Sequence, residues 1–491
     1  MQLTTSRHLH PIHTVAPSVA FPCKTYPRSA QADGLAILVG NKDDSYDSYL
    51  EAIEYVESFL PATGFERWKL ILDRFANPHE KFRSVHIAGT SGKGSVALMT
   101  GEILRSAGLR VGVHVKPYVQ SATESIIVDG RYVSCAEYVR LIERVKPVMA
   151  SMTTELSNRF GPVTWSEVTK ILPLLCFAKE GVDFGVVEAG VGGREDLTNV
   201  LKPEVSVITS VGMDHAELLG GTIDIIAHQK AGIIKHGVPS VTAVRQRNAL
   251  EVILTEAKQK GSELSVIGRD FGIRVRRVGL NQTEFDFKSD GLKLERVIVG
   301  MAGRYQAANA AVAIRAVEKL ANSGVHVTET SIRAGLGGAR LPGRFELVQE
   351  KPAVVLDVAH NVQKIGVLAR LLDEVFPDRK VTFVVGFLEG KDARRMVALL
   401  ARKARHIIFT SPSVRGKKPI DPGMLKKLAE KMTRATTLVD PDAMSAVDRA
   451  LSLAGDRGIV CVTGSLYLVG KVRGRWYDEK EVTERRTSYP E

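Results

Sequence analysis

The residues with the clearest chemical potential lie between Ser84 and Ser95, where an apolar run enters the glycine-rich sequence Gly89-Thr-Ser-Gly-Lys-Gly-Ser95. Glycines let backbone N–H groups approach phosphate oxygens, and a lysine such as Lys93 can reach the terminal phosphates of a nucleotide. The hydroxyl of Ser95 can contact Mg²⁺ beside a helix N-terminus. The segment predicts a phosphate-binding loop. A plain glycine-rich turn is the alternative, because Gly94 separates the lysine from the serine.

Acidic residues follow two further apolar runs. Glu188 comes directly after the run 183–187, and Asp214 and His215 follow the run 205–211. In doubly wound sheets, ligands bind outside the carboxyl ends of the strands. Each of these residues alone could be a helix cap or a satisfied polar group. Together with the phosphate loop they predict Mg²⁺-nucleotide chemistry, because Mg²⁺ prefers hard oxygen ligands and a histidine nitrogen is a softer addition.

Helices and strands must alternate to position these residues. Helical spacing predicts helices over 46–60, 66–75, the segment from the phosphate loop to Gly108, 166–180, 222–233 and 304–322. Continuous apolar runs predict strands over 110–115, 183–188, 205–211 and 239–244. Such strands between helices favour a parallel sheet buried on both faces. Short alternating runs between 262 and 300 predict a small antiparallel insertion.

A second βα block follows a predicted linker. The linker residues share a tendency to break regular structure: Gly335, Gly337, Gly338, Pro342 and Gly343. Strands are expected near 353–358, 381–386, 406–410, 436–439 and 458–463. The fold class is therefore α/β: a P-loop-containing parallel-sheet ATPase domain plus a smaller Rossmann-like C-terminal domain. We expect a disordered extension over 1–45, a central ATP-binding domain over 46–340 and a C-terminal domain over 341–491.

Composition and charge narrow the class of protein. The 491 residues suggest about two or three domains, and 44% hydrophobic with 25% charged residues is ordinary for an α/β protein. No apolar run approaches the roughly 20 residues of a membrane span, so no membrane partner is expected. The formal net charge of +12 could indicate a nucleic-acid partner, but the basic residues are scattered, so anionic small substrates are expected instead.

Cysteine usage and the N-terminus bear on location. The four cysteines are far apart without CxxC spacing, which argues against a zinc site or a disulfide framework: Cys23, Cys135, Cys176 and Cys461. Residues 1–32 contain no Asp or Glu, which faintly resembles an organellar transit peptide. Low arginine content and four prolines favour a disordered extension. We expect a cytoplasmic monomer, with a mitochondrial or plastid location as the alternative.

Seven motifs occur in order along the chain: His86–Ser95, Glu188–Arg194, Asp214–His215, Gln229–Ile233, Leu341–Phe345, Leu356–Asn361 and Gly464–Tyr467. From about residue 46 to 475, this set resembles the folylpolyglutamate synthase and dihydrofolate synthase family of Mur-ligase-type enzymes. The resemblance implies an ATP- and Mg²⁺-dependent amide ligase. Such an enzyme would add L-glutamate to the carboxylate of a folate or dihydropteroate through an acyl phosphate.

The resemblance also implies roles for individual residues. ATP would be held by Gly89, Thr90, Ser91, Gly92, Lys93, Gly94 and Ser95, with Asn309, Arg344 and Asp357. Metal ions would lie near Ser95, Glu188, His215 and Lys230. Lys230 matches a lysine that the family modifies to a carbamate, which turns an ammonium into an anionic oxygen ligand. Lys93, Lys230 and His360 would act at the reacting groups.

One position departs from the family pattern. The chain has Val115-Lys-Pro-Tyr-Val119 where the family usually shows Ser-Pro-His-Leu with a serine near Mg²⁺. An ammonium close to Mg²⁺ is repulsive, so Lys116 must point away, bind phosphate or ionise differently. Two alternatives therefore stay open. The chain could be a Mur-type ligase for a different acid acceptor, or an ATP-binding relative without catalytic activity.

Overall fold

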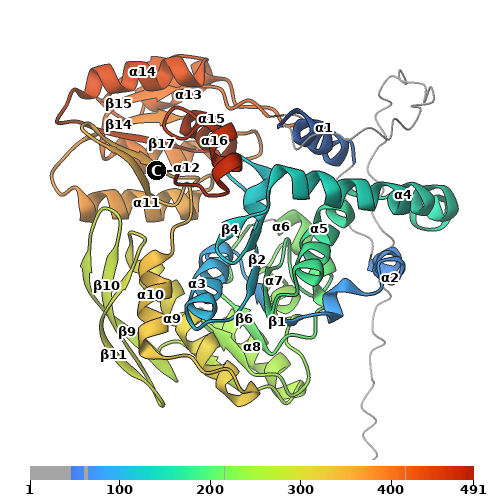
Figure 1. Ribbon diagram of the computed structural model, residues 1–491. Helices are drawn as coiled ribbons and strands as arrows, with labels where there is room; N and C mark the ends of the chain where they lie inside the picture. Colours follow the sequence, from blue (N-terminus) through green and yellow to red (C-terminus); the bar gives the residue numbers. More distant parts are fainter. Residues whose placement is uncertain (1–45, 60–64, 215, 415, 491) are drawn as a thin grey trace, which may run out of the picture. The chain divides into compact units, whose positions relative to one another are not determined.

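The computed structural model describes residues 46–59, 65–214, 216–414 and 416–490, and all of them belong to one compact unit (Figure 1). The extension expected over 1–45 and the predicted metal ligand His215 lie outside the described residues. None of the described helices is long and apolar enough to cross a bilayer.

The larger sheet has eight strands in the order β4-β3-β2-β5-β1-β6-β7-β8. They are β1 (Arg83–Ala88), β2 (Val111–His114), β3 (Ile126–Val128), β4 (Arg131–Tyr132), β5 (Phe184–Glu188), β6 (Val205–Ile208), β7 (Ser240–Thr242) and β8 (Leu264–Val266). The six strands from β2 to β8 are parallel, and β3 and β4 form an antiparallel edge. The predicted parallel sheet is confirmed. Because β1 lies between β5 and β6, the segments that follow these three strands meet at one edge of the sheet.

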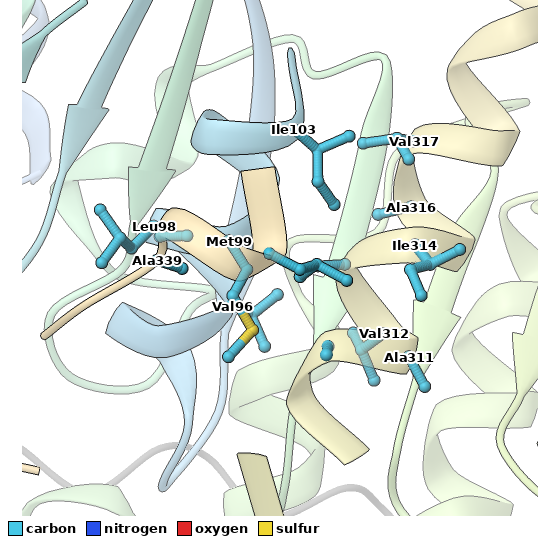
Figure 2. Close-up of a cluster of buried hydrophobic side chains, with 14 of the residues drawn as sticks. Val96, Leu98, Met99, Ile103, Ala311, Val312, Ile314, Ala316, Val317 and Ala339 are labelled. Atoms are coloured by element: carbon cyan, nitrogen blue, oxygen red, sulfur yellow. The ribbon is translucent and has the colours of Figure 1, made fainter. Parts of the chain in front are cut away.

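Helices cover this sheet through several apolar clusters, of which two are the largest. One cluster involves α3 (Lys93–Ser106), α9 (Arg304–Leu320) and α10 (Glu329–Gly338). The other involves α1 (Tyr46–Glu57), α2 (Phe65–Arg74), α4 (Cys135–Phe160) and α5 (Trp165–Glu180). Figure 2 shows side chains of α3, such as Met99 and Ile103, facing Val312, Ala316 and Val317 of α9. The buried face of α3 thereby fixes the helix that begins with Lys93.

Local sequence signals set the ends of several helices. At the start of α5 the Thr164 hydroxyl accepts a hydrogen bond from the Glu167 N–H, and the Glu167 carboxylate accepts one from the Thr164 N–H. This reciprocal cap satisfies two N–H groups that the helix itself leaves free. The helix stops at Gly181, whose φ of 59° favours glycine. The predicted helix over 166–180 is confirmed, whereas the 26-residue helix α4 was not predicted.

The glycines that were predicted to form a linker belong mostly to a helix. Gly335, Gly337 and Gly338 lie in α10, so the linker interpretation was wrong for them. A Cβ added at Gly335 would lie 2.6 Å from the backbone N and Cα of Ile103. Glycine is therefore needed there because α10 packs directly against the backbone of α3. The connection between α10 and the second sheet is shorter than predicted and spans 339–345.

The predicted antiparallel insertion is a three-stranded sheet. It contains β9 (Phe271–Val278), β10 (Thr283–Ser289) and β11 (Lys293–Val299) in the order β11-β10-β9. Alternate residues such as Phe285 and Phe287 are buried in the cluster that includes α9. The insertion begins later than predicted, because β8 pairs in parallel with β7 of the main sheet. The remaining helices before it are α6 (Ala216–Leu219), α7 (Ile223–Ala231) and α8 (Arg247–Gln259).

The smaller sheet has six strands in the order β12-β13-β17-β14-β15-β16. They are β12 (Glu346–Glu350), β13 (Ala353–Leu356), β14 (Val381–Val385), β15 (Ala404–Phe409), β16 (Thr436–Val439) and β17 (Ile459–Thr463). Its helices are α11 (Val362–Val375), α12 (Ala393–Ala401), α13 (Pro422–Glu430), α14 (Ala443–Ala454), α15 (Leu466–Arg473) and α16 (Glu479–Arg485). The five predicted parallel strands are confirmed, and the antiparallel edge strand β12 was missed. The domain boundary after residue 340 stays a proposal. It is supported by the sheet topology, because all strands of the larger sheet precede residue 340 and all strands of the smaller sheet follow it.

Candidate active site

The glycine-rich segment between β1 and α3 is held by the two residues that follow the neighbouring strand β6. The Ser91 N–H donates to the Ser210 hydroxyl at 2.9 Å, and the Thr209 hydroxyl donates to the Ser91 carbonyl at 2.7 Å. Gly89 has φ 151°, and a Cβ there would lie 1.9 Å from the Thr209 hydroxyl oxygen. Thr209 and Ser210 were not predicted, because the expected strand 205–211 enclosed them. β6 ends at Ile208, and a polar pair at a strand end was the signal.

Lys93 and Glu188 meet at this loop. Lys93 is the first residue of α3, and its Nζ lies 3.5 Å from Oε1 of Glu188 at the end of β5. The second oxygen of Glu188 accepts a hydrogen bond from the Lys116 N–H at 3.0 Å. Glu188 is only 4% exposed, and this burial raises its pKa, although the charge of Lys93 opposes the rise. The predicted phosphate and metal residues are therefore adjacent.

The residues around Glu188 fit a Mg²⁺ ion. No group of three His, Cys, Asp or Glu that could hold a metal occurs in the described ranges. Mg²⁺ needs few protein ligands, because substrate phosphates and water supply the others. A buried carboxylate beside a phosphate-binding loop and the buried Ser95 match this requirement. The metal assignment of Ser95 and Glu188 remains a prediction.

Lys230 is a buried lysine in α7 with 3% exposure. Burial and the charge of Lys93 lower its pKa to about 7, and Asp214 opposes this change. A lysine with this pKa is largely uncharged at slightly alkaline pH, and an uncharged amine is the form that adds CO₂. The environment therefore suits the predicted carbamate, which stays a prediction.

Asn309 reaches the phosphate loop from α9. A Cβ at Gly92 would lie 2.6 Å from Oδ1 of Asn309, so the amide lies directly against the loop. The Asn309 amide donates to Oε1 of Gln306 at 2.9 Å. Nε2 of Gln306 is buried and has no hydrogen-bond partner among the described residues. Because a buried orphan donor is costly, Gln306 is a further candidate ligand-binding residue that the sequence did not single out.

Of two predicted nucleotide residues, Arg344 lies in the connection between the sheets and Asp357 follows β13. Asp357 is buried, and its carboxylate accepts hydrogen bonds from the N–H groups of Phe345 and Ala359 at 2.9 and 2.8 Å. Burial raises the pKa of Asp357 to about 6. Within the described residues, Arg344 makes two long contacts, of 3.5 and 3.4 Å, to the carbonyls of Pro342 and Gly343. Asp357 thus shapes the turn that carries Arg344, whose guanidinium makes no short contact to these carbonyls.

His360 belongs to a polar group that includes Asp214. Its Nδ1 lies 2.8 Å from the Val358 carbonyl, which can only accept, so Nδ1 carries the proton. Burial and the nearby charge of Lys364 lower the pKa of His360 to about 4. Nε2 therefore accepts from the Lys364 ammonium at 3.2 Å, and the same ammonium lies 3.1 Å from Asp214. Lys364, in the first turn of α11 and four residues after His360, was not predicted.

The side chain of Lys116 packs away from Glu188. Its Nζ lies 3.8 Å from the ring centroid of Trp165, at the start of α5. Burial and the charge of Lys170 lower its pKa well below the usual range. Nζ is buried and has no hydrogen-bond partner in the described part of the chain, and Lys116 is one of the residues that line a cavity of about 20 Å³. Of the three expected behaviours, the structure agrees with a side chain that points away and ionises differently.

Comparisons with known proteins agree with this architecture. Residues 135–317 match the Mur ligase middle domain, and residues 343–466 match the Mur ligase glutamate ligase domain. The dihydrofolate synthase/folylpolyglutamate synthase of Bacillus subtilis is 35% identical over 441 residues, which cover 88% of this chain and 99% of that protein. The enzyme of the same name from Mycobacterium tuberculosis is 30% identical over 460 residues, which cover 88% of this chain and 94% of that protein.

Solved structures give the same result. The Mycobacterium tuberculosis folylpolyglutamate synthase complexed with ADP and AMPPCP matches with a TM-score of 0.82 and 28% identity, covering 88% of this chain and 99% of that chain. The folylpolyglutamate synthase of Thermotoga maritima matches with a TM-score of 0.78 and 33% identity, covering 88% and 97%. The chain therefore belongs to the folylpolyglutamate synthase/dihydrofolate synthase family within the Mur ligase superfamily, a family of ATP-dependent glutamate ligases.

Proposed function

We propose that this chain joins L-glutamate to the carboxylate of a folate or dihydropteroate and converts ATP to ADP and phosphate. The observation that carries the proposal is the pairing of Lys93 with the buried Glu188 at the phosphate loop. Curated relatives of similar length, named for both ligase activities, support the choice of substrates.

Amide formation in water requires an activated acyl group. A carboxylate oxygen of the acceptor attacks the γ-phosphorus of ATP, the bond to ADP breaks, and an acyl phosphate forms. The amine of glutamate then attacks the acyl carbon, phosphate leaves, and the amine loses a proton. Each step moves negative charge, so fixed positive groups around the phosphates lower the barriers.

The phosphate loop supplies the first of these groups. Lys93 can reach the terminal phosphates, and the N–H groups at the start of α3 favour anions. Ser95 and Glu188 would hold Mg²⁺, and a carbamate on Lys230 would support a second ion. When bound, Mg²⁺ neutralises charge on the phosphates that the chain alone cannot balance. Asn309 adds a neutral amide next to Gly92, with its oxygen nearest to the loop and its NH2 group donating to Gln306.

The connection 339–345 and the smaller sheet supply further groups for the nucleotide and the substrates. Arg344 lies close enough to Glu188 for its charge to lower the pKa of that carboxyl, so it can act on the same nucleotide. His360 is uncharged at neutral pH and presents the lone pair of Nε2 to an ammonium, as it does to Lys364. We propose that His360 acts at the reacting groups by orienting Lys364. Closure of both sheets around the acyl phosphate excludes the water that would hydrolyse it.

The alternative of a different acid acceptor rested on Lys116. Because that side chain packs over Trp165 and only its backbone N–H contacts Glu188, we do not favour this alternative. The test of the proposal is glutamate-dependent release of ADP with dihydropteroate and with tetrahydrofolate, measured separately. The same comparison decides which acceptor is used.

A further inference from the structure

The end of the chain contacts both halves of the protein. We define residues 477–490 as the C-terminal strap; it follows α15, contains α16 and lies beyond residue 466, where the family match ends (Figure 1). The strap runs along the edge strand β4 of the larger sheet. The Tyr132 N–H donates to the Arg486 carbonyl at 2.9 Å, and Nε of Arg486 donates to the Tyr132 carbonyl at 2.6 Å. The hydroxyls of Tyr132 and Ser488 are also hydrogen-bonded.

Arg473, at the end of α15, is the centre of these contacts. It is fully buried, and its guanidinium pairs with the buried carboxylate of Glu346, the first residue of β12, at 2.8 Å. A second N–H group donates to the side-chain oxygen of Gln120, and a third donates to the Ser488 carbonyl at 2.5 Å. Rings of Tyr477 and Tyr489 lie 4.3 and 5.4 Å from its central carbon. One side chain thereby joins the strap, strand β12 and the segment that contains Gln120.

Both partners of Arg473 lead to the active site. Glu346 accepts a hydrogen bond from the Gly343 N–H at 2.8 Å, directly before Arg344. Gln120 belongs to the segment 116–121, whose first N–H holds Glu188, and its amide donates to the Tyr477 carbonyl of the strap at 2.9 Å. The strap, the linker and this segment together line a cavity of about 230 Å³. This network reaches Arg344 through Glu346 and Glu188 through the segment 116–121, so it can set the distance between Arg344 and Glu188.

We propose that Arg473 is a positioning residue of the ligase and that the strap holds Arg344 and Glu188 at the spacing the reaction needs. This inference rests on the proposed function. Loss of the network lets the linker and the segment 116–121 move apart, so that water reaches the acyl phosphate. ATP is then consumed without amide formation. The expected signature is a changed ratio of ADP released to amide formed.

Two variants test this role. One variant is a chain that ends at Arg485. The other is Arg473→Lys, which keeps the positive charge but loses the planar set of guanidinium N–H donors. In both variants, glutamate-dependent turnover is expected to fall about 10- to 100-fold. ADP release without glutamate falls less, so the ratio of ADP to amide rises. A merely structural role lowers both rates together and leaves this ratio unchanged. Arg475→Lys is the matched control, because Arg475 pairs with Asp448 inside the smaller domain.

Hydrogen exchange tests the same inference without activity. In the chain that ends at Arg485, amide exchange should quicken in 116–124 and 339–346 and stay unchanged in β13 to β17. An unchanged ADP-to-amide ratio together with unchanged exchange would overturn the role of the strap. If the full chain shows no glutamate-dependent turnover with either acceptor, the proposed function fails, and the exchange measurement alone decides the positioning role. If the shortened chain does not fold, the ADP-to-amide ratio and the hydrogen exchange are both measured on Arg473→Lys.

Discussion

Nζ of Lys93 lies 3.5 Å from Oε1 of Glu188, so the phosphate-loop lysine and a strand-end carboxylate form an ion pair. The pair joins the first residue of α3 to the last residue of β5. A nucleotide phosphate can take the lysine, and a divalent ion can take the carboxylate. The ion pair thus keeps both ligand-binding groups in place in a buried site.

Glu188→Ala is expected to reduce turnover by at least about 100-fold, because a charge-stabilising group at the phosphates is lost. The fold should remain, since Glu188 ends its strand and belongs to no apolar cluster. Steady-state ADP release and circular dichroism measure the two effects. Glu204→Ala is the matched control, because Glu204 pairs with Arg83 at the opposite end of the central strands. Equal turnover in the Glu188 variant and the control would remove Glu188 from the site.

Lys230→Ala is expected to abolish most activity, and short carboxylates such as acetate should restore part of it. The physical reason is that a carboxylate in the vacated space supplies the anionic oxygen that the carbamate supplies in the natural chain. The natural enzyme should also lose activity reversibly when bicarbonate and CO₂ are removed at pH 8. Full activity of Lys230→Met without added carboxylate would exclude the carbamate.

Gly335→Ala is expected to lower the free energy of unfolding by about 1–3 kcal/mol, because the new methyl group would meet the backbone of Ile103. Gly337→Ala is the control in the same helix. Nothing lies within 4 Å of its added Cβ, so it should be neutral or stabilise by up to about 1 kcal/mol. Urea denaturation compares the two variants. Equal effects would show that α10 does not approach α3 as closely as the structure has it.

Acid should destabilise the protein through two buried histidines. Burial lowers the pKa values of His86 and His114 to about 3, against an ordinary value of 6.5. Between these values the unfolded chain binds more protons than the folded one, so stability rises with pH from about 3 to 6.5 and falls on acidification. Each histidine contributes a slope of up to about 1.4 kcal/mol per pH unit. His86→Gln should flatten this slope between pH 6 and 5, and an unchanged slope would contradict the assignment.

Sequence patterns predicted the parallel strands well, because a short apolar run such as 184–187 is typical of a strand that is covered on both faces of a parallel sheet. They failed at Gly335, where the same residue type suits a linker or a close helix contact. Only the neighbouring helix decides between the two. The direction of Lys116 was likewise open, since Trp165, far along the chain, provides its surroundings. Gln306 was missed because its orphan amide is visible only once α9 lies beside the phosphate loop.

The most direct measurement of the central claim is ADP release by the full chain with ATP, Mg²⁺ and L-glutamate, in the presence of dihydropteroate or tetrahydrofolate. ADP formation is expected to require the acceptor and to be faster with glutamate, and in the presence of glutamate a product heavier by one glutamate residue should appear in equal amount. Folded protein that binds ATP but forms no such product with either acceptor would contradict the account.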